Sequence, residues 1–381
     1  MAGFYLHIPF CRKACHYCDF HFSTQLSKID EMVAAMKQEI DLRASDWNDT
    51  IFETVYLGGG TPSLLSIDQL KELIDRAYEK LTFSADLEFT LECNPEDITA
   101  ERLGQWKALG VNRLSIGIQS FDDRALKMMN RAHDSRTALT ALEAAVNQFD
   151  RVSVDVIYGI PGLSDAQLTQ DLDQFIDLGV THISAYALTV EPKTALDRFI
   201  RDGLIAPVDE EQAERQFLLT LDQLTAAQFL HYELSNFTKP GHESRNNSAY
   251  WQRKPYLGIG PAAHSFKGDE RRWNVASNPK YIKAMNERIP NYGSEILSKR
   301  DHYNEYVMTS LRTHWGVSLE VLAQRFGPSY RDYFSMISTP FLLDNLLFED
   351  DGAIRATRKG KFLIDGVSSA LFMLELKGAK E

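Results

Sequence analysis

Apolar and polar residues follow two different periods along the first half of the chain. Short runs rich in β-branched, aliphatic and aromatic residues predict six strands, at residues 4–8, 54–57, 87–92, 113–117, 152–157 and 182–188. Segments with helical spacing of apolar positions predict the helices between them, at 29–42, 67–81, 100–109, 137–149 and 166–178. Strands alternating with helices favour parallel pairing through right-handed crossovers. The pattern therefore predicts an α/β fold, either an open doubly wound sheet or an incomplete barrel.

Local signals support the ends of several of these helices. Ser66 lies three residues before Gln69, as in a capping box, and Thr99 precedes a helical run. Gly110 follows Leu109, where a helix is expected to end.

The second half of the chain shows a change of pattern. Residues 256–265 form a glycine-interrupted apolar strand and turn suited to closing one mouth of a barrel, and residues 271–274 suggest a connector. Helical spacing returns at 301–311, 319–326 and 330–347, then Asp350-Asp351-Gly352 predicts a hairpin turn, and a helix is expected to begin near Thr357. We therefore expect three parts: a partial barrel at 1–230, barrel-closing strands and a connector at 231–299, and a helical, winged-helix-like domain at 300–381.

Composition and charge narrow the class of protein. The chain has 381 residues, 44% of them hydrophobic, which is enough for a sizeable core. A formal charge of −12 argues against a nucleic-acid partner, because such proteins neutralise phosphates with basic residues. We find no secretory signal and no apolar run that could cross a bilayer, so we expect a cytoplasmic protein.

The most informative stretch is Cys11-Arg-Lys-Ala-Cys15-His-Tyr-Cys18, which holds three of the four cysteines. This spacing lets three thiolates ligate three irons of a [4Fe-4S] cluster, with the fourth iron open. The alternative is a structural zinc site completed by His7, His16 or His21. The remaining cysteine, Cys93, is expected to be a small buried residue.

Unusual polar residues follow the carboxyl ends of the predicted strands, where ligands bind in parallel α/β folds. They are Gly58-Gly59-Gly60-Thr61-Pro62, Glu92-Cys93-Asn94-Pro95, Gln119, Asp155 and Tyr186. Backbone N–H groups of the glycines are candidates to hold a carboxylate, although a tight turn explains them equally well. Glu92 and Asp155 lie in apolar strands, so they must pair with Arg113 or Arg131 or bind ligand hydroxyls. We expect this ring to surround one polar ligand above the cysteine loop.

These residues resemble a known family over nearly the whole chain. Its motifs are residues 5–11, the cysteine triad, Gly58 to Ser63, the run Ile-Gly-Ile-Gln-Ser-Phe at 116–121, and Asp-Val-Ile-Tyr-Gly at 155–159. The chain resembles the radical S-adenosylmethionine (SAM) superfamily, in its oxygen-independent coproporphyrinogen III oxidase-like branch. The resemblance implies an incomplete (β/α)6 radical SAM barrel with a smaller α+β C-terminal domain.

The resemblance also implies cofactors and the residues that hold them. It assigns Cys11, Cys15 and Cys18 to a [4Fe-4S] cluster and SAM to the fourth iron. It places nine residues around SAM: Tyr5, Tyr17, Gly60, Thr61, Glu92, Gln119, Arg131, Asp155 and Ala187. The chemistry implied is one-electron cleavage of SAM to a 5′-deoxyadenosyl radical that abstracts hydrogen.

At two positions this chain departs from motifs of the family, and these positions indicate which branch of the family it resembles. The oxidases carry a further cysteine two residues after the third ligand, where this chain has Phe20, as the haem chaperones do. The chaperones show a His-Asn-x-x-Tyr-Trp motif, and here Asn246 occupies the histidine position. Since an amide is not a usual haem ligand, haem would stack on Tyr250 or Trp251 or use His242 or His264.

Three function classes follow. A haem chaperone, which binds haem and transfers it to a recipient protein, is favoured. A coproporphyrinogen III oxidase, or a radical enzyme with another substrate, is the alternative, and a structural zinc protein is a remote one. The expected partners are haem or a porphyrinogen and a haem-recipient protein, with membrane association only through a partner. Enzyme activity, the haem ligand and the oligomeric state stay open.

Overall fold

Six parallel strands form the centre of the fold, in chain order. The computed structural model describes residues 2–374. The strands are β1 (Ala2–Ile8), β2 (Ile51–Gly59), β3 (Thr82–Cys93), β4 (Arg113–Gln119), β5 (Val152–Tyr158) and β6 (His182–Ala187). Each pairs in parallel with the next, so the six predicted strands and their parallel pairing are confirmed. Most β1 side chains are buried, as expected for a strand covered on both faces.

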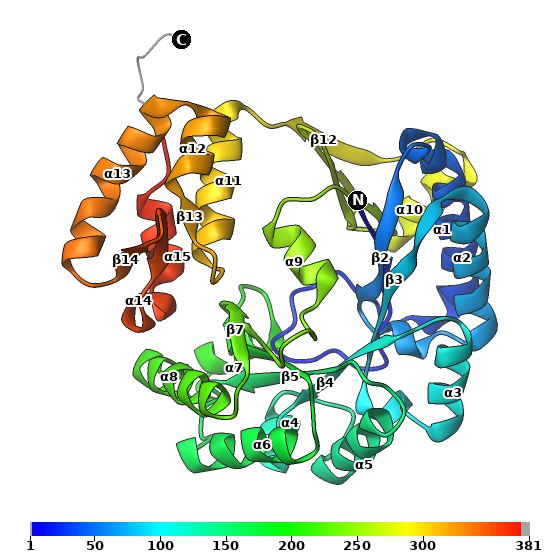
Figure 1. Ribbon diagram of the computed structural model, residues 1–381. Coiled ribbons are helices and arrows are strands. Elements are labelled where there is room, and N and C mark those ends of the chain that lie inside the picture. Colours follow the sequence, from blue (N-terminus) through cyan, green and yellow to red (C-terminus); the bar gives the residue numbers. More distant parts are fainter. Residues whose placement is uncertain (1, 375–381) are drawn as a thin grey trace. The chain divides into compact units, whose positions relative to one another are not determined.

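Helices connect these strands and lie along one side of the curved sheet (Figure 1). They are α1 (Ile29–Arg43), α2 (Ile67–Lys80), α3 (Ala100–Ala108), α4 (Asp123–Met128), α5 (Ser135–Val146) and α6 (Asp165–Asp177). Ser66 and Gln69 form the expected capping box, and Thr99 accepts a hydrogen bond from the N–H of Arg102. Gly110 ends α3 with φ +95°, which a glycine adopts without strain.

The sheet continues beyond β1 and β6 and does not close. Its order is β12-β11-β10-β9-β1-β2-β3-β4-β5-β6-β8-β7. The added strands are β7 (Leu230–Glu233), β8 (Asn236–Thr238), β9 (Tyr256–Ile259), β10 (His264–Lys267), β11 (Glu270–Asn274) and β12 (Tyr292–Ile296). The connector expected at 271–274 is wrong, because these residues pair with β10 as a strand. The incomplete barrel is confirmed as an open mixed sheet.

The remaining connections of this region are helices. They are α7 (Ala195–Arg201), α8 (Glu210–Ala226), α9 (Arg245–Trp251) and α10 (Asn278–Asn286), with short 3-10 turns η1 (Leu26–Lys28), η2 (Ala44–Trp47), η3 (Pro62–Leu64) and η4 (Pro95–Asp97).

The chain divides into two compact units. Unit 1 comprises residues 2–230, 237–249 and 254–295, and unit 2 comprises residues 231–236, 250–253 and 296–374. Unit 1 contains the six-stranded parallel core. The three-part division drawn from the sequence stays a prediction.

Unit 2 has the element order of a winged helix. Its elements are α11 (Lys299–Leu311), β13 (Val317–Ser318), α12 (Leu319–Phe326), α13 (Pro328–Leu343), β14 (Leu347–Asp350), β15 (Ala353–Ala356), α14 (Arg358–Phe362) and α15 (Ile364–Ala370). The strands β13 and β14 flank β15 and run antiparallel to it. Tyr303, Leu322 and Phe334 are fully buried in its core.

The hairpin expected near residue 351 is confirmed. Asp351 and Gly352 both have positive φ, as a two-residue hairpin turn with the right twist requires. Thr357 caps α14, where a helix was expected. The helix expected to reach Leu347 ends earlier, because Asn345 takes a φ of +55° that no α-helix continues.

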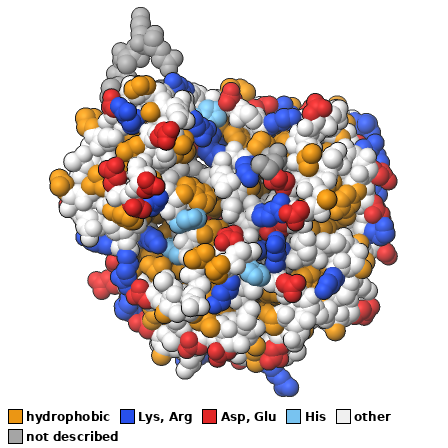
Figure 2. Space-filling view, in the orientation of Figure 1, with side chains coloured by type: hydrophobic (Ala, Val, Ile, Leu, Met, Phe, Trp, Pro, Cys, Tyr) orange, Lys and Arg blue, Asp and Glu red, His pale blue; other side chains and the backbone are white. Residues whose placement is uncertain are grey.

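The surface carries mixed charge. On the face shown in Figure 2, acidic and basic side chains are interspersed rather than gathered by sign. Within residues 2–374, no helix combines the length and apolar character needed to cross a membrane.

Candidate functional site

The cysteine loop, residues 9–23, leaves the carboxyl end of β1 and returns to the start of η1. Its two stems are joined by backbone hydrogen bonds, from the N–H of Cys11 to the Ser23 carbonyl at 3.1 Å and from the N–H of Ser23 to the Pro9 carbonyl at 2.9 Å. The tip is held from the opposite side, because the N–H of His16 donates to the Met129 carbonyl at 3.1 Å. The loop is therefore anchored at its base and at its tip.

All three loop cysteines are free, partly exposed thiols that meet hydrogen-bond donors. Thr61 Oγ1 donates to Cys11 Sγ at 3.5 Å, and an Arg131 guanidinium N–H donates to Cys15 Sγ at 3.3 Å. Such donors stabilise a thiolate. Burial raises the pKa of Cys18 to about 11, so this thiol holds its proton unless a metal replaces it.

Of the three histidines considered for a zinc site, only His7 has both ring nitrogens engaged by hydrogen bonds within the described chain. His7 donates from Nε2 to the His21 carbonyl at 2.9 Å and accepts at Nδ1 from Tyr5, while His16 Nδ1 bonds the Met128 carbonyl at 2.7 Å. Across residues 2–374, no three His, Cys, Asp or Glu side chains are already gathered as a metal site. The three thiols must therefore be drawn together by the group they bind.

Glu92 lies at the end of β3 and is held by two donors. Tyr56 on β2 donates to Glu92 Oε1 at 2.7 Å, and the N–H of Gly59 donates to Oε2 at 3.2 Å. Burial nevertheless raises the pKa of Glu92. Gly58 makes room for this pair, since a Cβ there would lie 2.9 Å from Tyr56 Cε1 and 3.0 Å from Glu92 Cδ.

Asp155 on β5 is the second carboxylate of the site. Burial and the neighbouring Glu92 charge raise its pKa to about 7, while a hydrogen bond with Ser184 on β6 and the charge of Arg131 lower it. Asp155 is therefore poised to titrate near neutral pH. Two carboxylates close enough to interact electrostatically favour a ligand with positive charge or several hydroxyl donors.

Arg131 forms hydrogen bonds both with the cysteine loop and with residues at the ends of β3 and β4. One of its terminal nitrogens donates to Asn94 Oδ1 and to the Gly117 carbonyl, both at 2.8 Å, while its Nε is buried without a partner in the described chain. A Cβ at Gly117 would lie 3.1 Å from this guanidinium and 3.0 Å from Gln119 Nε2. The glycine lets both side chains approach the strand closely.

The backbone N–H groups of the glycine turn after β2 form hydrogen bonds within the protein. The N–H groups of Gly60 and Thr61 donate to the carbonyls of Ile8 and Phe10, each at 2.8 Å, and that of Gly59 donates to Glu92. The expectation that these N–H groups are free to hold a ligand carboxylate is therefore wrong. The turn packs on the cysteine loop so closely that a Cβ at Gly60 would lie 2.6 Å from the Phe10 carbonyl oxygen.

The structure also places the other residues expected around SAM. Tyr5 lies on β1 beside His7 and Tyr56, and Tyr17 lies between two loop cysteines, where burial raises its pKa. Gln119 is buried at the end of β4 with φ +69°, and Ala187 is the last residue of β6. These positions all belong to β1, its loop or the ends of the parallel strands.

One pairing and one burial state expected from the sequence can be checked. Arg113 does not pair with Glu92; its guanidinium lies 3.8 Å from the carboxylate of Glu88, four residues earlier on β3. Cys93 is buried, as expected, and its thiol donates to the Ser115 carbonyl at 3.7 Å.

Sequence reasoning missed Tyr56, Asn94 and Ser184 as partners of the site residues. Tyr56 was the easiest to find, because a tyrosine two residues before the triple glycine lies near the carboxyl end of β2. Asn94 was expected at the site by its place after β3 but not as the partner of Arg131. Ser184 carries no local signal, since only the parallel register of β5 and β6 brings it beside Asp155.

Asn246 is a buried structural residue. It is 4% exposed, its side-chain oxygen accepts from Thr54 Oγ1 at 3.1 Å, and its N–H donates to Glu88 at 3.0 Å. A side chain at this position faces the sheet and not an open cavity.

Comparison with known proteins agrees with this geometry. Residues 5–175 match the Radical SAM superfamily, and residues 297–363 match the HemN C-terminal domain. The solved coproporphyrinogen III oxidase HemN from Escherichia coli superposes with a TM-score of 0.86 at 25% identity, over 98% of this chain and 90% of that one. Fold and site thus define a radical SAM protein with a HemN-type C-terminal domain, in a superfamily that uses a [4Fe-4S] cluster and SAM.

Similarity to curated proteins identifies the family within this superfamily. The chain is 34% identical to the heme chaperone HemW of Bacillus subtilis (strain 168), covering 99% of this chain and 100% of the relative. It is 36% identical to HemW of Mycobacterium tuberculosis (strain ATCC 25618 / H37Rv), covering 97% and 94%. The chain therefore belongs to the HemW family.

Proposed function

We propose that this protein is a haem chaperone, which binds haem on a radical SAM scaffold and transfers it to a recipient protein. The observation that carries the proposal is full-length similarity to proteins named heme chaperone HemW. The cysteine loop supports it, because the position two residues after Cys18 is Phe20, which is 69% exposed, and not a fourth cysteine.

The proposed cofactor site follows the family pattern. Cys11, Cys15 and Cys18 ligate three irons of the cluster, and Tyr5, Tyr17, Gly60, Thr61, Glu92, Gln119, Arg131, Asp155 and Ala187 surround SAM. When bound, the cluster and SAM together supply one-electron chemistry. Support comes from the donors to Cys11 and Cys15 and from the partnerless buried Nε of Arg131.

The chain's own residues hold and orient the ligand. Arg131 carries a positive charge between the loop and the ends of the strands, where it attracts the carboxylate of SAM. Glu92 and Asp155 accept hydrogen bonds from the ligand's hydroxyl and ammonium donors. Tyr56 keeps Glu92 oriented through its 2.7 Å hydrogen bond.

A second candidate is oxidation of coproporphyrinogen III or of another substrate. The similarity to HemN over 98% of this chain favours it, because the two chains share one fold across both matched domains. We further propose that the protein acts in the cytoplasm, that residues 1–230, 231–299 and 300–381 are its functional parts, and that it reaches membranes only through a recipient protein.

Two measurements on the anaerobically reconstituted protein test these functions. Haem titration followed by absorption should show stoichiometric binding, and transfer should follow when an apo-haemoprotein is added. Coproporphyrinogen III with SAM and a reductant should give no product. Product formation without haem binding would favour the oxidase, and iron-free protein containing zinc would refute both.

A further inference from the structure

The haem ligand of this chain must be sought away from position 246, because Asn246 is buried and bonded to Thr54. His21 has the features of a metal ligand. Its Nε2–H donates to Asn278 Oδ1 at 2.8 Å, so Nδ1 keeps its lone pair, and within residues 2–374 no hydrogen-bond partner of Nδ1 is present. A ligating histidine usually donates its other ring N–H to an oxygen in this way, which fixes the tautomer and the ring orientation.

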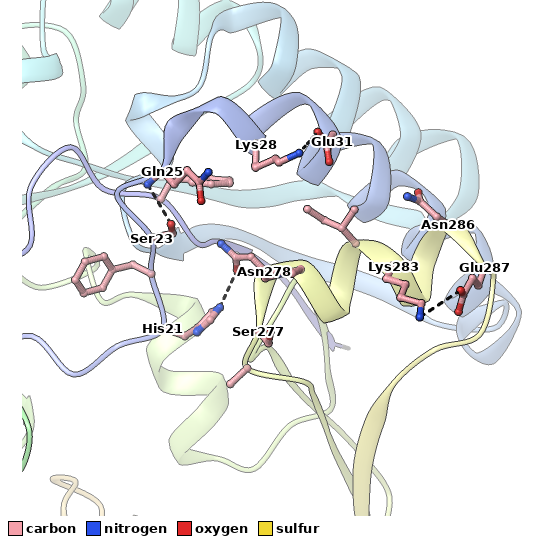
Figure 3. Close-up of a pocket in the computed structure, with 15 residues that line it drawn as sticks. His21, Ser23, Gln25, Lys28, Glu31, Ser277, Asn278, Lys283, Asn286 and Glu287 are labelled. Atoms are coloured by element: carbon pink, nitrogen blue, oxygen red, sulfur yellow. Dashed lines mark hydrogen bonds and ion pairs between the residues drawn. The ribbon is translucent and has the colours of Figure 1, made fainter.

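His21 lines a pocket of about 720 Å³, which lies between the start of α1 and α10. Figure 3 shows the residues that line it, with His21 at one end beside Asn278. The volume lies within the range of small-molecule sites. Phe10, Phe22 and Ile282 contribute apolar side chains to a lining that is otherwise mostly polar, and every lining residue belongs to unit 1.

Two lysines flank this pocket from opposite walls. Lys28 comes from η1 and Lys283 from α10, as Figure 3 shows. Each ammonium pairs with a glutamate on its own side, Lys28 with Glu31 at 2.5 Å and Lys283 with Glu287 at 3.8 Å. All four side chains are about half exposed or more, so these pairs contribute little and are easily exchanged for other carboxylates.

We propose that this pocket is the haem site, with His21 Nδ1 as an axial ligand of the iron and Lys28 and Lys283 pairing with the two propionates. The inference rests on the proposed chaperone function and names where on the chain the cargo binds. The space between α10 and residues 21–31 accommodates a flat ring, Phe22 and Ile282 offer apolar contacts to the porphyrin face, and an imidazole nitrogen with a lone pair suits the iron. Glu31 and Glu287 then turn away from their lysines into solvent.

The same pocket is built on the cysteine loop. Phe10 immediately precedes Cys11, and His21 lies three residues after Cys18. Ser23, also in the lining, bonds the backbone of Pro9 and Cys11. The His21 carbonyl accepts from His7, which packs against the glycine turn at Gly59. Haem bound at His21 therefore contacts both stems of the loop that is proposed to hold the cluster.

The test is a haem titration of the full-length, anaerobically reconstituted protein and its variants. His21→Ala should lose the axial-ligand spectrum and bind haem at least about tenfold more weakly. His302→Ala is the matched control, because His302 lies on α11 in unit 2 and is not among the residues that line the pocket, and this variant should bind haem as the wild type does.

Two further variants distinguish a loss of haem binding at the pocket from damage to the cysteine loop. Lys28→Gln combined with Lys283→Gln should weaken haem and iron-free protoporphyrin equally, by about tenfold, whereas His21→Ala should affect haem alone. Lys37→Gln is the control, since Lys37 lies on α1 and pairs with Glu72 away from the pocket. Asn286→Trp fills the pocket from α10 without touching the cysteine loop and should abolish binding while iron and sulfide content stay unchanged.

The outcomes are distinct. Haem binding by the wild type that is lost in the pocket variants and kept in both controls supports the site. Equal binding by the wild type and all pocket variants overturns the site and leaves the chaperone function standing. Absence of haem binding by the wild type overturns the chaperone function, and the haem site with it.

Discussion

Asp155 should make both stability and SAM affinity depend on pH. Its pKa rises from the ordinary 3.8 to about 7 in the folded protein, mainly because burial disfavours the charge. The folded state therefore keeps a proton that the unfolded state releases, and stability must fall as pH rises from about 4 to 7. A rise of about three pH units corresponds to about 4 kcal/mol, at about 1.4 kcal/mol per unit. Because the Asp155 side chain retains some exposure, this value is an upper bound.

The perturbation is Asp155→Asn, which removes the titrating group and keeps its shape. Without ligands, the variant should be more stable than the wild type at pH 8, by up to about 4 kcal/mol, and the gain should shrink towards pH 5. Urea unfolding at several pH values measures this difference. Asp171→Asn should show a smaller stability gain of the same sign, because burial raises the pKa of Asp171 to about 6, and it is the control for SAM binding, because its partner is Ser120, outside the proposed SAM site.

SAM binding should show the opposite trend. If ligand donors require the ionised carboxylate, about one tenth of the protein is competent at pH 6, so affinity should rise roughly tenfold from pH 6 to pH 8. Calorimetry on the reconstituted protein measures it, and Asp155→Asn should remove the pH dependence along with most of the affinity. A stability difference that does not change between pH 5 and 8, or a wild-type affinity that does not change, refutes the reasoning.

Four other changes have defined outcomes. Gly59→Ala should destabilise the protein by at least about 2 kcal/mol in urea, because φ is +109° and the new Cβ would lie 2.6 Å from His7 Nδ1. Arg131→Met should weaken SAM binding about tenfold by calorimetry while iron content is kept, because three cysteine ligands remain. Asn246→His should cost about 1–3 kcal/mol of stability through overpacking and add no haem affinity in titrations. Leu322→Ala should cost about 2–5 kcal/mol in unit 2, measured by thermal unfolding, because Leu322 is fully buried.

Three of these changes have a control or a contrary result. Gly104→Ala has open space at its Cβ in α3, so it should be neutral or stabilising where Gly59→Ala is not. Unchanged SAM affinity in Arg131→Met would remove Arg131 from the proposed site. Haem binding gained by Asn246→His would show that the motif position can open despite its burial.

The order and type of most elements in the parallel core followed from local pattern. Each predicted core strand and helix exists, because a run such as 152–157 or 67–81 carries its period in neighbouring residues and its ends in caps such as Ser66. The cysteine spacing was equally local, and it identified the superfamily. Errors arose where local pattern was weak, as in β11, whose strand state depends on pairing with β10.

The sequence by itself determined the alternation of strands and helices, the cysteine loop and the family, since all three are properties of short stretches. The tertiary structure decided which polar groups are free. It showed that the N–H groups of the glycine turn serve the cysteine loop, that Tyr56 orients Glu92, and that Asn246 faces Thr54. It also brought His21 and Asn278 together across 257 positions of the chain. Such contacts depend on register and packing between distant segments, which no local periodicity encodes.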